Sequence, residues 1–431
     1  MKRTEKQIAW KNRLSIKNRT TIQWFVMLVS FWSFLFMTIN VLPGPLSYLK
    51  YLPDGILALL LIMALRKKRF CVREVLVSPL RLVVIFFSFC LVVSVFRHQS
   101  VAYFLWGFRN NFRFYIAFFA FIAYLDELDV ETWFKALDIL FWINAALSAV
   151  QFFVLGLKGD FLGGIFGVLG ASNGYSLCLM SIVVGKSLLD AFSQKKRFFG
   201  VIIQVLVAVF IATMAEMKFF FFIVAFLTIG ASMITGFSGR KLAVILLCMV
   251  ALSMGATYLV DMFGFEDFFS LEKLWESATQ ENYSSSGDIN RLVAIESLVS
   301  RLNMTPLDQV LGYGLGNCDT SAFAFCNTPF YVQYGHLHYT WFTSAMLFLE
   351  TGCLGMVLYI SFFCICGVKA FRNQKKDIGN LAYNRLAFLM SILCVVMVFY
   401  DSSLRVESGY MMYFVLALPF FREKVETPEN A

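Results

Sequence analysis

The chain has 431 residues, of which 59% are hydrophobic and only 15% are charged, and its formal net charge is +9. This composition excludes an ordinary soluble domain, because most segments have no polar face to turn towards water. The positive charge does not indicate nucleic-acid binding, because the basic residues form short clusters beside apolar runs, without stacking aromatic residues between them.

About twelve predominantly apolar runs follow one another along the chain. Roughly 17 to 25 apolar residues are enough for a helix to cross the hydrocarbon core of a bilayer. The runs are unbroken and lack the alternation of a barrel strand, so helices are expected. The predicted spans are 21–42, 51–65, 79–96, 103–124, 136–156, 169–191, 198–214, 219–236, 241–260, 339–367, 384–400 and 406–421. The sequence therefore predicts an all-α, polytopic membrane helix bundle that forms a single integral membrane domain over residues 1–431.

The positions of the basic residues predict the orientation of these spans. Seven Lys or Arg residues against a single acidic residue in the first twenty place the N-terminus in the cytoplasm. Further basic clusters follow the second, sixth, eighth and tenth spans, at 66–73, 195–197, 240–241 and 369–376. We therefore expect both termini to be cytoplasmic, and residues 261–338 to form a large external loop between spans nine and ten.

The external loop is predicted to contain short helices. Apolar spacing indicates amphipathic turns at 271–275 and 292–302, and a Ser-rich turn at 282–287 separates them. Cys318 and Cys326 also lie in this loop, where an oxidising compartment would let them pair. A disulfide and two free thiols are equally supported by the sequence.

A glycine-rich run, Gly312, Gly314 and Gly316, follows in the same loop. A dinucleotide site would need a strand before the glycines and a helix beginning within them, and neither is predicted. We expect instead a flexible loop that approaches a bulky ligand. Aromatic residues further along are candidates for stacking on sugar faces or for an interfacial belt: Phe323, Phe325, Tyr331 and Tyr334.

Two histidines, His336 and His338, immediately precede the tenth span. Residues two apart on a helix point to nearly opposite faces, so we expect one of them to be catalytic or orienting. Histidine is the natural general base near neutral pH. An interfacial histidine and a helix cap are the alternatives.

Several charges lie where burial makes them costly. Arg109 and Arg113 are near the start of the fourth span, Glu216 and Lys218 lie between spans seven and eight, and Arg291 is in the external loop. Snorkelling or salt bridges within the membrane would explain them individually. Four cations on one external face would also suit a diphosphate headgroup, which Arg binds in bidentate fashion and Lys as a point charge.

Taken together, these pieces resemble the bacterial O-antigen polymerase and O-antigen ligase superfamily, the type C membrane glycosyltransferases. The resemblance covers most of the chain in order and spacing. The matching pieces are Gly164-Ile165-Phe166-Gly167 with Ala171-Ser172-Asn173, Ala215-Glu216-Met217-Lys218, Gly287-Asp288-Ile289-Asn290-Arg291, Leu311-Gly312-Tyr313-Gly314-Leu315-Gly316, and His336-Leu337-His338 leading to Glu350-Thr351-Gly352-Cys353-Leu354-Gly355.

The resemblance implies transfer of a glycan from an undecaprenyl-diphosphate carrier to an acceptor hydroxyl, without a metal or other cofactor. It makes His338 the base, with Arg291 as the catalytic loop cation and Lys218 as a phosphate contact. The family commonly has Arg where Lys218 stands and Asn where Tyr339 stands. The remaining candidates for substrate binding are Arg109, Arg113, Glu216, Asp288, Tyr313 and His336, of which Asp288 either orients Arg291 or is only a loop carboxylate.

Three functions are compatible with the sequence. The first is a polymerase that joins carrier-linked repeat units into O-antigen, capsular or exopolysaccharide in the bacterial inner membrane. The second is a ligase that moves finished glycan onto a lipid core or a protein. The third is a transporter or flippase. The two halves of the chain show no symmetry, which argues against this third function. For a polymerase, a chain-length regulator and a flippase are further candidate partners, beside the lipid bilayer.

Overall fold

The computed structural model describes residues 20–66, 74–170, 172–193, 198–263, 280, 287–321, 323–376, 378 and 380–421. Within these residues the protein is all-helical, as the sequence predicted, and contains no strand. The helix predicted at 271–275 and nearly all of the Ser-rich turn lie outside the described residues. So do both termini and the basic cluster at 195–197.

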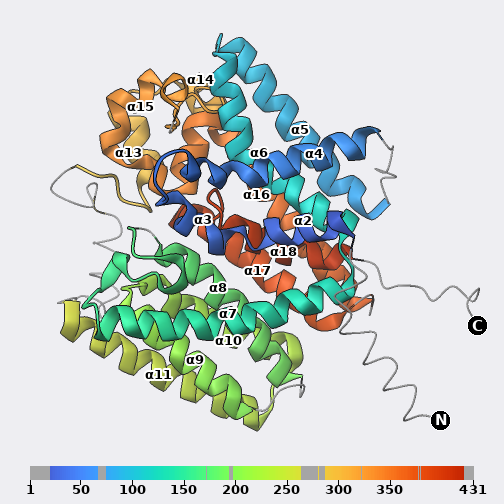
Figure 1. The fold of residues 1–431 in the computed structure, drawn as a ribbon, viewed down its shortest axis with the longest axis vertical. Helices are drawn as coiled ribbons and strands as arrows, with labels where there is room; N and C mark the ends of the chain where they lie inside the picture. Colours follow the sequence, from blue (N-terminus) through green and yellow to red (C-terminus); the bar gives the residue numbers. More distant parts are fainter. Residues whose placement is uncertain are drawn as a thin grey trace, which may run out of the picture.

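The α-helices are numbered along the chain in Figure 1. In order they are α2 (Thr21–Ser30), α3 (Trp32–Asn40), α4 (Leu52–Arg66), α5 (Glu74–Phe96), α6 (Val101–Tyr124), α7 (Glu127–Phe153), α8 (Asn173–Phe192), α9 (Phe198–Met214), α10 (Lys218–Thr235), α11 (Gly239–Phe263), α13 (Ala294–Arg301), α14 (Pro306–Leu311), α15 (Pro329–Tyr334), α16 (Thr343–Lys375), α17 (Leu381–Tyr400) and α18 (Gly409–Ala417). Short 3₁₀ turns connect them: η2 (Gly44–Tyr51), η3 (Gly159–Phe161), η4 (Gly164–Phe166), η6 (Ala324–Cys326), η7 (Gly335–Leu337), η8 (Tyr339–Trp341) and η9 (Leu418–Phe420).

Eight helical segments among the described residues are long and apolar enough to cross a membrane, and the bent pair α2–α3 makes up to nine. These segments indicate a membrane protein. The predicted count of twelve is not confirmed, although each predicted span does contain a helix. α9 and α18 are short, and α6 carries Arg109, Asn110, Asn111 and Arg113 within its length.

Burial separates central helices from peripheral ones. In α8, 94% of the most apolar window is buried, whereas in α5 the share is 22%. Apolar side chains that remain exposed on α5 include Val92 and Val95. Because such surface is unfavourable in water, α5 is expected to face lipid, and α8 lies inside the bundle.

A second, smaller core covers the beginning of α16. It contains Ile289, Leu298, Cys318, Leu337 and Tyr339, together with apolar residues of the first turns of α16. In Figure 1 the short helices α13, α14 and α15 gather at one edge of the molecule, away from the layer formed by α7 to α11. The described part of the loop between α11 and α16 therefore packs against the beginning of α16 and has its own hydrophobic core.

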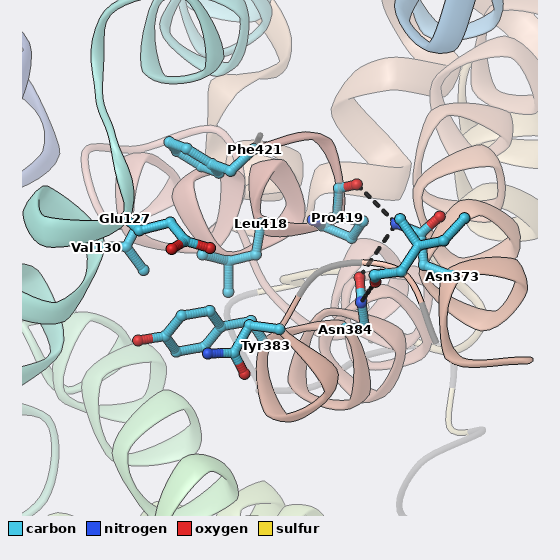
Figure 2. Close-up of a pocket in the computed structure, with 10 residues that line it drawn as sticks. Glu127, Val130, Asn373, Tyr383, Asn384, Leu418, Pro419 and Phe421 are labelled. Carbon is cyan, nitrogen blue, oxygen red and sulfur yellow. Dashed lines mark hydrogen bonds between the residues drawn. The ribbon is translucent and has the colours of Figure 1, made fainter. Parts of the chain in front are cut away.

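The ends of several helices meet in two groups. Glu127 at the start of α7, Asn373 near the end of α16, Tyr383 at the start of α17 and Phe421 after η9 line one small cavity (Figure 2). The opposite ends of α16 and α17 carry the predicted site residues. We call these two the cavity end and the site end of the molecule.

Candidate functional site

His338 lies between the 3₁₀ turns η7 and η8, in the left-handed conformation with φ 53°. Its imidazole stacks on the indole of Trp341, with ring centroids 4.2 Å apart and planes inclined by 12°. Its side chain is 42% exposed. The left-handed residue thus separates two 3₁₀ turns, and α16 begins only at Thr343, four residues after the predicted start of the tenth span.

The imidazole of His338 contacts a carboxylate. Its Nδ1 atom lies 2.5 Å from Oδ1 of Asp288, whose side chain is only 8% exposed. The backbone N–H of Ile289 donates to the carbonyl of Leu337 at 3.3 Å, which holds the two segments side by side. A carboxylate on one ring nitrogen fixes the orientation and tautomer of the ring, and leaves Nε2 for another partner. The contact adds a role for Asp288 that the sequence did not suggest, as a partner of the proposed base; that Asp288 orients Arg291 stays a prediction.

The second histidine does not join this pair. Nδ1 of His336 lies 3.1 Å from the carbonyl of Gln333, in an exposed local contact one turn earlier. A ring nitrogen on a carbonyl of the last turn of α15 has the geometry of a helix cap, one of the alternatives open from the sequence. The surroundings of the two histidines thus differ in the structure, and the sequence alone could not predict this difference.

Arg291 and Lys218 approach each other across a pair of stacked rings. The guanidinium of Arg291 lies 4.3 Å from the ring centroid of Tyr400 and 5.9 Å from that of Phe342. The ring of Tyr400 in turn stacks on that of Phe219, the residue after Lys218, with centroids 3.9 Å apart. The charges of Arg291 and Lys218 are close enough to interact. We call His338, Asp288, Arg291 and Lys218 the histidine cluster.

Lys218 begins α10, and the tight connection before it has an unusual backbone. Glu216 has φ 55°, and its carbonyl accepts a hydrogen bond from the Lys218 N–H at 2.9 Å. The Lys218 ammonium is 3.5 Å from a Glu216 carboxylate oxygen, and the two side chains are 32% and 29% exposed. Such a half-exposed pair contributes at most about 1 kcal/mol. A phosphate could therefore replace Glu216 as the partner of Lys218 at small cost.

Arg109 and Arg113 lie in a different network. Arg113 donates to Glu407 Oε1 at 2.7 Å, and both side chains are almost completely buried. Arg109 pairs with Asp54 at 2.8 Å and is 4.0 Å from Glu407. Each of the two cations on α6 therefore has a carboxylate partner, as the salt-bridge alternative from the sequence proposed.

A third arginine, which the sequence analysis did not select, completes this network. Arg405 lies 3.7 Å from Asp319 and 3.8 Å from the fully buried Glu350, and its Nε donates to Asn111 at 3.1 Å. We call the three arginines with these four carboxylates the arginine network: Arg109, Arg113, Arg405, Asp54, Glu407, Asp319 and Glu350. The polar run Asp401–Ser408 between two apolar segments was the available signal for Arg405 and Glu407.

The same polar run connects the network to the histidine cluster. Asp401 is partly buried, and its carbonyl accepts hydrogen bonds from the backbone and hydroxyl of Thr343. Burial raises the pKa of Asp401 to about 6, while hydrogen bonds from Ser403 and the charge of Arg291 act in the opposite direction. Four residues further along is Arg405. The histidine cluster and the arginine network are therefore neighbours at the site end. That His338, Arg291, Lys218 and at least one of Arg109 and Arg113 line a single cavity at the external membrane level is a prediction.

The glycine-rich run approaches protein backbone, and this corrects the expectation of a ligand there. A Cβ atom on Gly312 would lie 2.5 Å from the Glu350 carbonyl carbon, and one on Gly316 would lie 2.0 Å from the Tyr103 carbonyl oxygen. Both glycines have positive φ. The Gly316 N–H donates to Glu350 Oε1 at 2.8 Å. The run therefore joins α6 to α16 at the kink that Gly352 makes in α16.

Tyr313, a predicted substrate contact, belongs to this packing. Its N–H donates to the Leu349 carbonyl at 2.7 Å, and its ring lies 5.3 Å from that of Phe330. Burial and the nearby charge of Asp308 raise the pKa of its hydroxyl to about 12. Tyr313 is thus held within the second core, and no contact places it in the histidine cluster.

Cys318 and Cys326 are both free, which decides against the disulfide. Cys318 is buried in the second core, where its carbonyl accepts a hydrogen bond from the Tyr339 hydroxyl at 2.7 Å. The loop between the cysteines is closed by polar contacts. The Thr328 hydroxyl donates to the Asp319 carbonyl at 3.1 Å, and the Ser321 N–H donates to the Asn327 side chain at 2.7 Å.

The cavity in Figure 2 lies at the far end of α16 and α17 from these residues. It has a volume of about 30 Å³ and is lined by Asn373, Asn384 and Tyr383 among others. Asn373 donates to the Pro419 carbonyl at 2.8 Å, so the asparagines mainly join the ends of α16, α17 and η9. Space of this size admits water and excludes a glycan. Within the described residues, no group of His, Cys, Asp and Glu side chains is arranged to hold a metal ion.

A search of protein-family models gives no match to the chain, and no curated protein is similar to it.

Proposed function

We propose that the protein is a membrane glycosyltransferase that polymerises oligosaccharide repeat units carried on undecaprenyl diphosphate. The observation that carries this proposal is the contact between His338 and Asp288. Arg291 follows Asp288 by three residues, and its charge is close enough to that of Lys218 to interact. A base oriented by a carboxylate, beside cations that suit a diphosphate, combines the two requirements of glycosyl transfer from such a carrier.

In the proposed reaction, a hydroxyl of the acceptor glycan attacks the anomeric carbon of the donor. The Nδ1–H of His338 donates a hydrogen bond to Asp288, so Nε2 is unprotonated and takes the proton of the attacking hydroxyl. The new glycosidic C–O bond forms as the C–O bond to the diphosphate breaks, and undecaprenyl diphosphate leaves with the bonding electrons. No oxidant or reductant is needed.

Arg291 and Lys218 would stabilise the negative charge that grows on the departing diphosphate. Arg offers two parallel hydrogen bonds to phosphate oxygens, and Lys supplies a single compact charge. Tyr400 lies against the Arg291 guanidinium and stacks on Phe219, the neighbour of Lys218, so packed rings connect the segments that carry the two cations. Cations that are already in place need little reorganisation when the charge develops.

We propose further that all twelve apolar segments cross the bacterial inner membrane, with both termini in the cytoplasm and the site end outside. α6, α9 and α18 would then be spans despite polar residues or short length. In this topology α7 and α17 begin, and α16 ends, on the cytoplasmic side. The cavity end supports the topology, because α7 and α17 begin there, where α16 ends. Carrier-linked substrates presented outside would meet the histidine cluster there.

Deletion of the gene in its source organism tests the proposal. Cells should lose the polymer and accumulate single repeat units on the carrier. The wild-type chain should restore the polymer, and the His338→Ala variant, present at equal abundance, should not. Accumulation of long carrier-linked polymer in the deletion strain would instead establish a ligase, and unchanged carrier-linked glycan would contradict both.

A further inference from the structure

A group of five aromatic rings at the site end has no role in the reaction described above. Tyr48 and Tyr51 of η2, Trp106 of α6, and Phe323 and Phe325 around η6 come from three segments far apart in the sequence. We call them the aromatic cluster. Phe323 is at its centre, with ring centroids 5.8 Å from Tyr48, 5.4 Å from Tyr51, 5.9 Å from Trp106 and 5.7 Å from Phe325.

The cluster is accessible. Phe325 is 70% exposed and Tyr48 is 51% exposed, while Phe323, Tyr51 and Trp106 are partly buried beneath them. Tyr331 and Tyr334, the other aromatic residues that the sequence suggested for sugars, pack instead against the second core. The structure thus separates rings that stabilise the fold from rings that face outwards.

Hydrogen bonds hold the rings of the cluster in place. The indole N–H of Trp106 donates to the Thr320 carbonyl at 2.9 Å, which ties α6 to the loop carrying Phe323 and Phe325. The same loop is tied to the proposed base, because the Tyr339 hydroxyl donates to the Cys318 carbonyl. Tyr339 is the residue after His338.

Charged and amide groups border the rings on one side. The Arg109 guanidinium lies 5.0 Å from the Tyr51 ring and 5.2 Å from the Trp106 ring, and it is paired with Asp54. The Asn110 amide donates to Asp319 at 2.7 Å. A sugar has C–H faces that contact aromatic rings and hydroxyls that donate and accept hydrogen bonds. Fixed rings beside carboxylates, an amide and a guanidinium offer partners for both.

We propose that the aromatic cluster binds the neutral portion of the glycan, apart from the carrier diphosphate. The polar border favours a glycan over the acyl chain of a lipid, because a lipid contact needs no carboxylates or amide beside the rings. This inference rests on the proposed function, since it deepens the substrate binding of the same enzyme. Under this inference, the loop between Cys318 and Thr328 binds substrate in addition to packing against the bundle.

The test uses purified full-length protein in detergent and a glycan that lacks the diphosphate. The probe is the single-repeat oligosaccharide released from the organism's own polysaccharide by partial hydrolysis, and binding is measured by calorimetry. The wild type and His338→Ala should bind it equally, because neither the base nor the phosphate contacts are involved. Phe323→Leu and Phe325→Leu should each weaken binding roughly 2- to 12-fold, the range expected for one ring contact.

Two variants distinguish ring stacking from simple apolar contact. Phe325→Trp should preserve binding, since it keeps an aromatic face, whereas Phe325→Leu keeps only apolar bulk. Phe153→Leu is the matched control, because Phe153 is an exposed ring at the end of α7, at the same end of the molecule. Binding in this control should equal that of the wild type.

Absence of oligosaccharide binding by the wild type would overturn the inference, as would Leu variants that bind like the wild type. The latter result would identify the rings as a lipid-facing surface. Neither result bears on polymerisation itself, which stands or falls on the glycans that accumulate in the deletion strain.

Discussion

The arginine network and the histidine cluster lie next to each other at the site end, yet their charged side chains differ in exposure to solvent. In the network, Arg113 and Arg405 are 6% and 8% exposed, and buried carboxylates lie against them. In the cluster, the side chains of His338 and Lys218 are 42% and 32% exposed. Deeply buried ion pairs such as those of Arg113 and Arg405 compensate the cost of desolvation and leave little for a ligand, whereas more exposed groups can exchange water or a weak partner for substrate.

This difference assigns distinct tasks to residues that looked equivalent in the sequence. Arg109, Arg113, Lys218 and Arg291 are all cations near one end of the helices, and all were candidates for a diphosphate. The contacts indicate that the two on α6 hold the loop Asp401–Ser408 and α6 together. The other two are the better candidates for the substrate. Changes in the network should therefore reduce stability first, and changes in the cluster should reduce activity first.

The largest expected effect is on activity, from His338→Ala. Removal of a general base typically lowers the rate about 10²- to 10⁴-fold. Polymer formation in reconstituted membranes should fall by this factor, while the protein keeps its abundance and thermal stability. The control is His336→Ala, because the ring of His336 makes an exposed local contact with the Gln333 carbonyl, and its loss should leave the rate nearly unchanged. Normal polymer from His338→Ala would remove the catalytic assignment.

Next in size is a loss of stability from Glu407→Ala. This change leaves the Arg113 guanidinium buried without its main carboxylate and also removes the acceptor of the Tyr175 hydroxyl. An uncompensated buried charge costs about 3–5 kcal/mol. We expect a markedly lower melting temperature in detergent and less protein in the membrane. Glu296→Ala, at an exposed carboxylate on α13, should change neither; equal stability of the two variants would contradict the structural role of the network.

The contrast between these regions also shows what the sequence could predict. The apolar runs predicted the position of nearly every long helix, because burial in lipid requires continuous hydrophobicity. Ion pairs such as Arg113 with Glu407 follow no periodicity, since 294 residues separate the partners. Asp288 was recognised as a candidate, but its contact with His338 depends on a left-handed residue that no propensity indicates. The glycines were recognised as positions of close approach, and only the structure identified backbone as what approaches them.

A smaller effect should appear as a pH dependence caused by Asp401. Burial raises the pKa of this carboxyl from 3.8 to about 6 in the folded protein. Because the folded state holds the proton more tightly than the unfolded state, this contribution to stability is fully present below pH 3.8 and is lost as the pH rises through 6. At neutral pH the free energy of unfolding of the wild type should therefore be lower by up to about 3 kcal/mol than it would be with this contribution.

Asp401→Asn removes the titrating group and should therefore stabilise the protein at pH 7 to 8 relative to the wild type, but not at pH 4. The measurement is the melting temperature of both proteins in detergent across this range. Glu296→Gln provides the control for a carboxylate that is exposed. Parallel curves for the wild type and Asp401→Asn would show that Asp401 ionises in the folded protein as freely as in the unfolded chain.

The smallest effect distinguishes the two cations of the histidine cluster from those of the network. Lys218→Ala should raise the donor concentration needed for half-maximal rate about tenfold, because one charge-assisted hydrogen bond to phosphate is lost. Stability should hardly change, since the half-exposed contact with Glu216 contributes little. Lys158→Ala, at an exposed lysine before η3, should leave both quantities unchanged. Lys218→Arg should restore the donor affinity, because a guanidinium also binds phosphate and its fork can engage two oxygens. If Lys218→Ala instead lowers the melting temperature and leaves the donor dependence intact, Lys218 belongs with the structural ion pairs, and Arg291 alone would be left to contact the diphosphate.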